Sequence, residues 1–182
     1  MVSQIYTGLF TRFQQRLSSA GGESHQVACL AAAADLIVAH PALAAGEIVV
    51  QPNFGSHQHW GAILPLLSSK GITIREAGSP ASAELAVAET GSVLLAENAL
   101  AVRVVSMLTL THFVFVSEDK LVPMLDDAAV VLQQLTRSGS DQRHYCSFVT
   151  GPSRTADIER TLTIGVQGPK TLCVIVVANE GE

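Results

Sequence analysis

The chain has 182 residues, of which 48% are hydrophobic and 5% aromatic, and it carries a formal net charge of −5. A chain of this length and hydrophobic content can bury the core of one domain, which we expect over residues 1–182. The negative charge argues against nucleic acid or an anionic membrane as a partner. Because Asp35, Arg103 and His112 interrupt the longest hydrophobic stretches, no membrane span is predicted.

The three cysteines, Cys29, Cys146 and Cys173, lie far apart in the sequence. None belongs to a Cys-x-x-Cys pair, which argues against an iron–sulfur cluster or a structural zinc site held by this chain alone. His57 and His59 would point in opposite directions at the start of a helix, so no shared metal is predicted there. Free thiols are typical of a reducing compartment, and we therefore expect a cytoplasmic protein without a metal or cofactor of its own.

The first part of the chain contains signals for helices and parallel strands. Hydrophobic residues recur at helical spacing over residues 6–17, and a second, alanine-rich helix is predicted over about residues 26–39. Residues 47–51 and 72–74 are predicted strands, with a helix over about residues 57–69 between them. This order is typical of a βαβ unit with parallel strands.

The second part continues the alternation of strands and helices. Two hydrophobic runs within residues 85–95 are too close together for a helical crossover, so a hairpin or bulge is expected there. Residues 112–116 and 172–177 are predicted buried strands, and a helix is predicted from Pro123 to Arg137. The whole pattern predicts an α/β fold, a three-layer α/β/α sandwich with a mostly parallel sheet.

The segment over residues 150–169 is the first candidate for a functional site. Gly151-Pro152 predicts a turn after the hydrophobic run at residues 145–149, and the hydroxyl groups of Ser153 and Thr155 could cap a helix that opens at residue 156 or 157. Ligand sites in open α/β sheets lie at such turns between a strand and a helix.

Three interpretations of this turn stay open. Asp157 and Glu159 could simply satisfy the dipole of the predicted helix and pair with a neighbouring arginine. The same two carboxylates could instead accept hydrogen bonds from a ligand that carries hydroxyl groups. Alternatively, backbone amides with Arg154 could cradle a phosphate or carboxylate.

The polar residues 89–92 between the two hydrophobic runs are the second candidate. A carboxylate at Glu89 would be partly desolvated, which raises the pKa of a carboxyl group and suits it to act as an acid, base or nucleophile. The alternative is a bulge in which Gly91 bends the backbone while Thr90 and Ser92 form local hydrogen bonds.

Four motifs together resemble the LUD family of lactate-utilisation proteins, and among these the C type. They are Ala-Glu-Thr-Gly-Ser at residues 88–92, Pro-Met-Leu-Asp-Asp-Ala-Ala at 123–129, Gly-Pro-Ser-Arg-Thr-Ala-Asp-Ile-Glu at 151–159 and Gly-Val-Gln-Gly-Pro at 165–169. The resemblance covers roughly residues 79–178. The family usually has His at the position of Gln167.

The resemblance implies a fold like that of the superfamily of ribose-5-phosphate isomerase, glucosamine-6-phosphate deaminase and CoA-transferases. It also implies a three-component system that oxidises L-lactate to pyruvate, in which the other two components are iron–sulfur proteins. This chain would then be an assisting or scaffold subunit, and an exposed hydrophobic patch is expected. The alternative is an enzyme or ligand-binding protein that acts on an acyl-CoA, sugar phosphate or carboxylate, with Glu89 as base or nucleophile in a pocket shared with residues 151–157.

The sequence thus proposes one catalytic candidate, Glu89, and no metal ligand. The ligand-binding candidates are Thr90, Gly91, Ser92, Gly151, Pro152, Ser153, Arg154, Thr155, Asp157, Glu159 and Gly168. The expected partners are the iron–sulfur proteins, a small carboxylate or phosphate ligand and a second copy of the chain.

Overall fold

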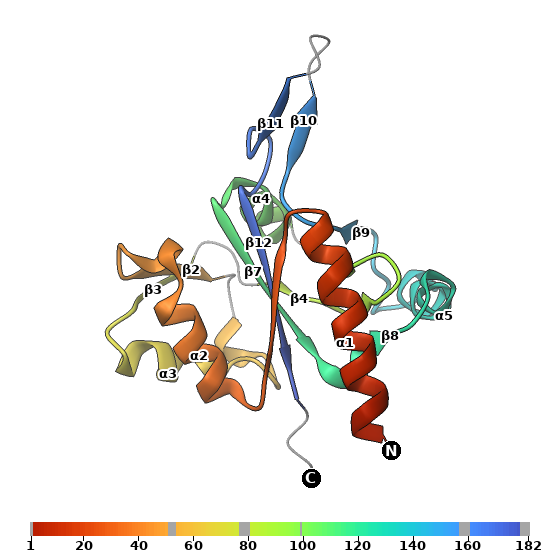
Figure 1. Ribbon diagram of the computed structural model, residues 1–182, viewed down its shortest axis with the longest axis horizontal. Coiled ribbons are helices and arrows are strands. Elements are labelled where there is room, and N and C mark those ends of the chain that lie inside the picture. The colour runs from red at the N-terminus through yellow and green to blue at the C-terminus, as the bar shows by residue number, and fades with distance from the viewer. Residues whose placement is uncertain (1, 51–53, 77–80, 99, 157–160, 179–182) are drawn as a thin grey trace.

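The computed structural model of the chain describes residues 2–50, 54–76, 81–98, 100–156 and 161–178 (Figure 1). Its helices are α1 (Val2–Ser19), α2 (Leu30–Ala39), α3 (Ile63–Ser69), α4 (Leu100–Leu108) and α5 (Leu125–Thr136), with 3-10 turns at Pro41–Leu43, Phe54–Ser56 and Glu118–Lys120. Its strands are β1 (Glu23–Val27), β2 (Glu47–Val50), β3 (Thr73–Glu76), β4 (Ala81–Ser82), β5 (Leu85–Val87), β6 (Ser92–Ala96), β7 (Thr111–Ser117), β8 (Leu121–Val122), β9 (Cys146–Val149), β10 (Arg154–Ala156), β11 (Leu162–Ile164) and β12 (Thr171–Val177). The predicted α/β class is confirmed.

The main sheet has the strand order β1-β12-β7-β4, and all of its strand pairs are parallel. The two central strands, β7 and β12, are almost continuous hydrophobic runs, as expected for strands that are covered on both faces. The last strand of the chain, β12, lies between β7 and the first strand, β1 (Figure 1). The mostly parallel sheet that the sequence predicted is therefore present, and β2 and β3 pair in parallel beside it, as predicted.

Alternate residues of β7 and β12 point to opposite faces of the main sheet and enter two different cores. On one face, strand residues pack with α2 and α3; they are Phe113, Phe115, Cys173, Ile175 and Val177. On the other face, strand residues pack against α1 and the second sheet; they are Val114, Val116, Leu172, Val174 and Val176. Helices thus cover both faces, and α1 shares its face with a second sheet.

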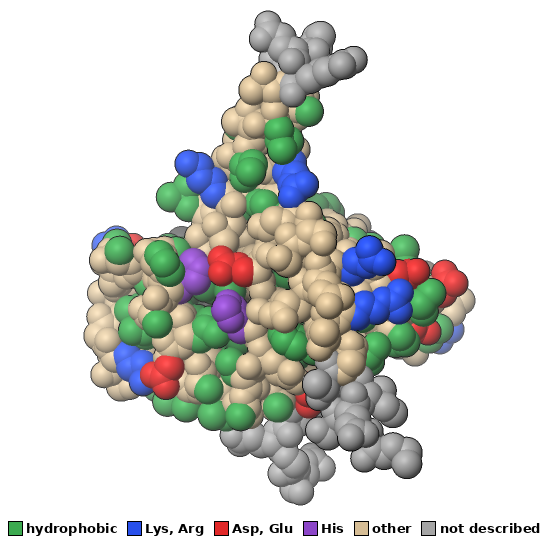
Figure 2. Space-filling view, viewed as in Figure 1, with side chains coloured by type: hydrophobic (Ala, Val, Ile, Leu, Met, Phe, Trp, Pro, Cys, Tyr) green, Lys and Arg blue, Asp and Glu red, His purple; other side chains and the backbone are tan. Residues whose placement is uncertain are grey.

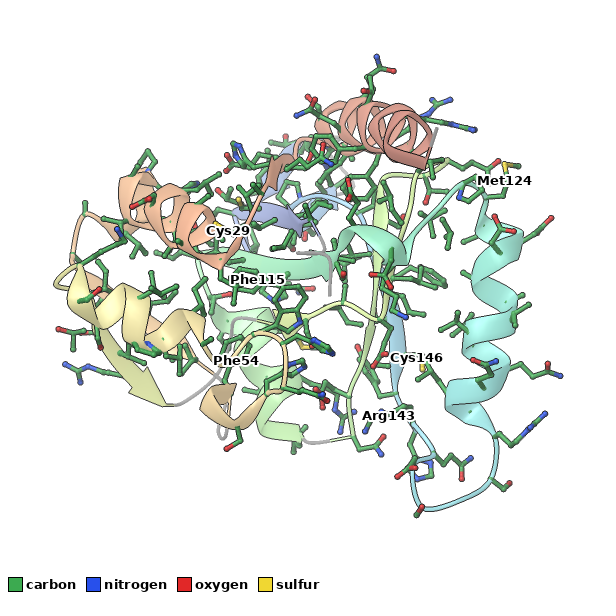
Figure 3. All side chains as sticks on the ribbon, turned by 90° about the horizontal axis from the view of Figure 1, so that it is seen from below. Cys29, Phe54, Phe115, Met124, Arg143 and Cys146 are labelled. Carbon is green, nitrogen blue, oxygen red and sulfur yellow. The ribbon has the colours of Figure 1, made fainter. Side chains whose placement is uncertain are left out.

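The second sheet has the order β8-β5-β6-β9. Its centre is the antiparallel pair β5 and β6, which confirms the hairpin expected within residues 85–95. Ala86 and Val93 face the core shared with the main sheet, whereas Leu85 and Leu94 face α5 and pack with Ala128. Figure 3 shows α5 outside this sheet, with α2 and α3 on the opposite side of the molecule.

The sequence predicted a helix that opens at residue 156 or 157. For the described residues this prediction is wrong. Arg154–Ala156 is strand β10, which pairs with β11 in an antiparallel hairpin that projects from the body of the molecule (Figure 1). Thr155 and Thr163 are direct partners in this hairpin, and β-branched residues favour strands over helices. Asp157 and Glu159 lie outside the described residues.

Two further differences concern the first half of the chain. Residues 23–27 form strand β1, which the sequence did not predict because four of its five residues are polar or charged. This strand is at the edge of the main sheet, where half-exposed polar side chains are tolerated. The alanine-rich helix consequently begins at Leu30 rather than near residue 26, and the helix expected over residues 57–69 begins only at Ile63.

Candidate functional site

A cavity of about 300 Å³ lies between the two sheets, at the amino-terminal ends of β7 and β12. Its wall comes from β6, α4, β7, β9 and the loops that follow β9 and β11. The lining residues that carry a charged, imidazole, hydroxyl or amide group are Ser82, Glu97, Arg103, Ser106, His112, Tyr145, Ser147, Thr150, Ser153 and Gln167. Four of the ligand-binding candidates line it as well, namely Gly151, Pro152, Ser153 and Gly168.

His112 is the most deeply buried polar residue of this wall, with 2% of its surface exposed. Its position in β7 directs it to the face that carries Val114, the face shared with the second sheet. The Nε2 atom has no hydrogen-bond partner among the described residues. Burial lowers the pKa of His112 to about 4, so the ring is neutral at pH 7. A neutral, unpaired imidazole can either donate a hydrogen bond to a ligand or accept one.

Arg103 brings a positive charge to the cavity from α4. Its guanidinium carbon lies 4.8 Å from the centre of the Tyr145 ring, a cation–π contact that orients the group. Within the described part of the chain, Nε of Arg103 is buried without a hydrogen-bond partner and no carboxylate forms an ion pair with the side chain. A planar guanidinium with unused donors is suited to bind a carboxylate or phosphate.

Glu97 adds an acidic group to the same wall. Burial raises the pKa of its carboxyl group; the nearby Arg143 acts in the opposite direction, and Glu84 raises the pKa further. The residue follows β6, and its backbone N–H donates to the carbonyl oxygen of Tyr145 at 3.0 Å. A carboxyl group with a raised pKa, in one cavity with an arginine, can hold or exchange a proton near a bound anion.

The turn that follows β9 is held against the end of α1. Gly151 has a φ of 73°, and a Cβ at this position would lie 2.6 Å from the carbonyl oxygen of Ala20. The Arg154 guanidinium donates to that same carbonyl oxygen, so Arg154 ties the hairpin to α1. Ser153 is fixed from both sides, since its N–H donates to Pro169 and its carbonyl oxygen accepts from Gly165, both at 2.9 Å. These contacts place residues 150–153 along the cavity wall.

Glu89 occupies a different environment. Its Oε2 accepts a hydrogen bond of 2.9 Å from the backbone N–H of Leu125, the first residue of α5, and its own N–H donates to Pro123 at 3.1 Å. A carboxylate at this end of a helix stabilises the helix dipole. Glu89 does not line the cavity, so the described residues do not form the shared pocket expected for Glu89 and residues 151–157.

The rest of the turn at residues 89–92 packs against α1. Gly91 has a φ of 70°, and a Cβ there would overlap the backbone N of Leu17. Ser92 connects this turn to the cavity wall: its Oγ shares a hydrogen bond of 2.5 Å with Oγ1 of Thr150. Thr90 is half-buried, and its Oγ1 has no hydrogen-bond partner among the described residues.

Sequence reasoning did not select Glu97, Arg103 or His112 as site residues. A signal for two of them was present, because Arg103 and His112 each interrupt a hydrophobic stretch. A charged or polar group in such a stretch is costly to bury unless it has a function or a partner. No local pattern links them to Glu97, since the three come together only through the packing of α4, β7 and the end of β6.

A second cavity, of about 1010 Å³, lies at the carboxyl ends of β1, β7 and β12, a common ligand position in α/β sheets. His57 lines this cavity. Burial is the main cause that lowers the pKa of His57, and the nearby His59 lowers it further. Nδ1 of His57 already accepts from the backbone N–H of His59 at 3.3 Å. Lys120 and Glu84 give this wall charges of both signs. Glu89 does not line this cavity either. We assign the candidate site to the smaller cavity, where unpartnered nitrogen atoms of Arg103 and His112 are brought together.

An exposed hydrophobic stripe follows α4, beside the smaller cavity. Leu100, Val104 and Leu108 recur at four-residue spacing and are 65%, 40% and 78% exposed. Further exposed hydrophobic side chains on and just after α4, on β9 and in and around the projecting hairpin are Met107, Leu110, Phe148, Leu162, Ile164 and Val166. Figure 2 shows hydrophobic side chains along the projecting hairpin. Within the described residues, no helix is both long and hydrophobic enough to cross a membrane.

These features define a mixed α/β protein with a small cavity between two sheets, lined by hydrophobic side chains and by polar groups. The same fold occurs in the crystal structure of a DUF162 family protein from Deinococcus radiodurans, with a TM-score of 0.59, 18% identity and coverage of 94% of this chain and 98% of that one. The LUD domain model matches residues 81–177. The chain belongs to the LUD domain family, as the sequence motifs indicated.

Curated relatives carry the name Lactate utilization protein C. The protein from Bacillus velezensis is 35% identical over 94 residues, which are 52% of this chain and 39% of the relative. The protein from Bacillus licheniformis is 36% identical over 94 residues, with the same two coverages. The alignments with these two relatives thus take in well under half of the relatives' own length.

Proposed function

We propose that this chain acts in L-lactate utilisation, as an assisting subunit that binds a small carboxylate and docks on iron–sulfur partner proteins, which would hold the clusters. The observation that carries this proposal is the similarity to Lactate utilization protein C. Every residue that lines the smaller cavity falls within residues 81–177, the part that matches the LUD domain model. The relationship therefore covers the candidate site as a whole.

The chemistry of the cavity supports a small carboxylate as the ligand. The Arg103 guanidinium has unused donors for a carboxylate, and the neutral His112 ring can bond to an oxygen atom on the neighbouring carbon. Lactate and pyruvate both carry an oxygen at that carbon. A volume of about 300 Å³ is at the lower end of the range for ligand pockets, which suits a small organic acid.

The exposed stripe on α4 supports a docking role. Leu100, Val104 and Leu108 form one side of the helix, whereas Arg103, Ser106 and Met107 line the cavity. A partner seated on the stripe would thus lie directly beside the ligand. Exposed hydrophobic side chains that share one side of a helix are a feature of interaction sites.

The test is lactate-dependent oxygen uptake in a strain that lacks the gene and is complemented with variants at matched protein levels. Wild type should restore uptake, and the double variant Val104→Asp, Leu108→Asp should not. Val130→Asp is the control, since Val130 is 60% exposed on α5, away from the stripe. Unchanged uptake after deletion of the gene would overturn the assignment to lactate utilisation, and full rescue by the double variant would overturn the docking surface.

Ligand binding is measured separately on the purified chain by calorimetry with L-lactate and with pyruvate. We expect binding of one or both by wild type and a loss of at least about tenfold in affinity for Arg103→Gln, because a charge-assisted bidentate contact is removed. Arg137→Gln, on the exposed end of α5, is the matched control. Equal affinity in Arg103→Gln would place the carboxylate elsewhere.

An enzymatic role for the chain itself is the second candidate, and one observation favours it. Glu97 has a raised pKa in the cavity that also contains Arg103 and His112, an arrangement suited to proton transfer on a bound carboxylate or acyl compound. Under this alternative, Glu97→Gln abolishes turnover by the purified chain and keeps ligand binding. Glu89→Gln is the comparison, because the sequence favoured Glu89. Loss of turnover in Glu89→Gln but not in Glu97→Gln would place the catalytic carboxylate at the start of α5 rather than in the cavity.

A further inference from the structure

Strands β1 and β12 bring three metal-ligating side chains together on the face of the main sheet that packs against α2. Glu23 is the direct neighbour of Cys173 in the parallel register, and His25 lies two residues further along β1, so all three point to the same face. One ligand atom from each residue lies within 4.8 Å of the other two.

We propose that Glu23, His25 and Cys173 form a Zn²⁺ site. A carboxylate, an imidazole and a thiolate are the three side-chain ligands that Zn²⁺ uses in proteins, and three protein ligands leave a fourth position for water. The thiolate and imidazole select against Mg²⁺ and Ca²⁺, which prefer an all-oxygen environment. The site is independent of the proposed lactate function, because it lies on the opposite face of the main sheet from His112 and the smaller cavity.

His40 supports this arrangement as a second layer. Its Nδ1 accepts a hydrogen bond of 3.1 Å from the backbone N–H of Ala42, so the ring proton is assigned to Nε2. Nε2 then donates to Oε1 of Glu23, also at 3.1 Å. This bond leaves Oε2 of Glu23 turned towards His25, 3.9 Å from its Nε2. Hydrogen bonds that hold a ligating side chain in place are a usual part of metal sites.

One proposed ligand is buried and two are partly exposed, so a metal ion could enter the site from the solvent. Cys173 is fully buried, whereas the side chains of Glu23 and His25 are 40% and 41% exposed. The His40 ring is fixed edge-on against Phe113, with 5.1 Å between the ring centres. The thiol and the second-layer histidine are thus held by the core, and the two exposed ligands can adjust their torsions to close around the ion. A metal here would also join the polar edge strand β1 to the buried strand β12.

The test is titration of the full chain with ZnCl₂ and with CoCl₂ after treatment with a chelator. We expect one Zn²⁺ per chain by calorimetry, and with Co²⁺ a thiolate-to-metal charge-transfer band in the near ultraviolet. His25→Ala should weaken Zn²⁺ binding by about 100-fold or more, since a direct ligand is lost. Cys173→Ser should abolish the charge-transfer band. His59→Ala and Cys146→Ser are matched controls from outside the cluster and should bind as wild type does.

The proposal is wrong if Zn²⁺ binds His25→Ala as tightly as wild type, if the Co²⁺ band persists in Cys173→Ser, or if wild type binds no stoichiometric metal. Loss of binding in His59→Ala would place the metal at the second cavity and would equally overturn it. Because Cys173→Ser alters a buried position, Glu23→Gln is the second decisive variant. It changes a half-exposed side chain, and we expect it to weaken binding as His25→Ala does.

Discussion

The turn at residues 89–92 and the turn at residues 150–153 both pack against the C-terminal half of α1, and they differ in what their side chains face. Each contains a glycine with a positive φ: Gly91, at 70°, lies against the backbone of α1, and Gly151, at 73°, lies against Ala20, the residue that follows α1. The first turn directs its carboxylate to the N-terminus of α5, where Glu89 accepts a backbone hydrogen bond. The second turn lines the cavity.

The comparison shows that a motif can look functional in sequence for two different physical reasons. In the first turn, the glycine and the carboxylate are explained by packing and by a helix terminus, and the unpartnered Oγ1 of Thr90 does not line the cavity. In the second, the wall beside the turn contains nitrogen atoms of Arg103 and His112 that have no hydrogen-bond partner among the described residues. Unused donors and acceptors in a cavity are the better indicator of a ligand site.

The largest expected effect is that of Gly91→Ala. The new Cβ would overlap the backbone of α1 at a φ that L-residues rarely adopt, so we expect the free energy of unfolding to fall by about 3 kcal/mol or more. Gly46→Ala is the matched control, since its φ is 66° and a Cβ there meets nothing within 4 Å. Urea unfolding measures both, and an equal loss in the two variants would show that Gly91 matters only for its backbone conformation.

His112 makes the stability of the folded chain depend on pH. Its pKa in the folded protein is about 4, below the ordinary value of 6.5, so the unfolded chain binds more protons between these values. Stability should therefore fall by about 3 kcal/mol as the pH is lowered from 6.5 through 4. His112→Gln should lose this dependence in urea titrations at pH 7 and pH 4.5, whereas the exposed His144→Gln should keep it. If the free energy of unfolding fell equally between pH 7 and pH 4.5 in both variants, His112 would not be the source of the pH dependence.

The two turns are joined by the hydrogen bond between Ser92 and Thr150, which is expected to couple them modestly. A double-mutant cycle with Ser92→Ala and Thr150→Val should give a coupling free energy of about 1 kcal/mol in urea unfolding. Additive effects of the two substitutions would show that each turn is held by α1 independently of the other.

The smallest expected effect is that of Glu89→Gln, and it separates the two explanations of the first turn. If Glu89 only stabilises the start of α5, the substitution lowers the free energy of unfolding by about 0.5 kcal/mol and leaves lactate-dependent oxygen uptake intact. If oxygen uptake is lost while thermal unfolding is unchanged, Glu89 takes part in the function of the protein, as the sequence suggested. Glu97→Gln provides the comparison from the cavity wall.

Much of the fold could be predicted because its signals are local. The hydrophobic runs at β7 and β12, the periodic face of α5 and the short connection between β5 and β6 are each visible within about a dozen residues, and the structure confirms them. Strand β1 could not be predicted, because its polar residues become a strand only by pairing with β12 at the other end of the chain. The relation to the superfamily of isomerases, deaminases and CoA-transferases stays a prediction.

The sequence by itself determined the α/β class, membership of the LUD family and the position of residues 150–153 at a turn after a hydrophobic strand. The tertiary structure decided which polar groups meet. It brought Arg103, His112 and Glu97 into one cavity, turned Glu89 towards α5 and placed Glu23 beside Cys173. The physical reason is that strand register and helix packing fix contacts between residues far apart in the chain, and such contacts leave no local pattern in the sequence.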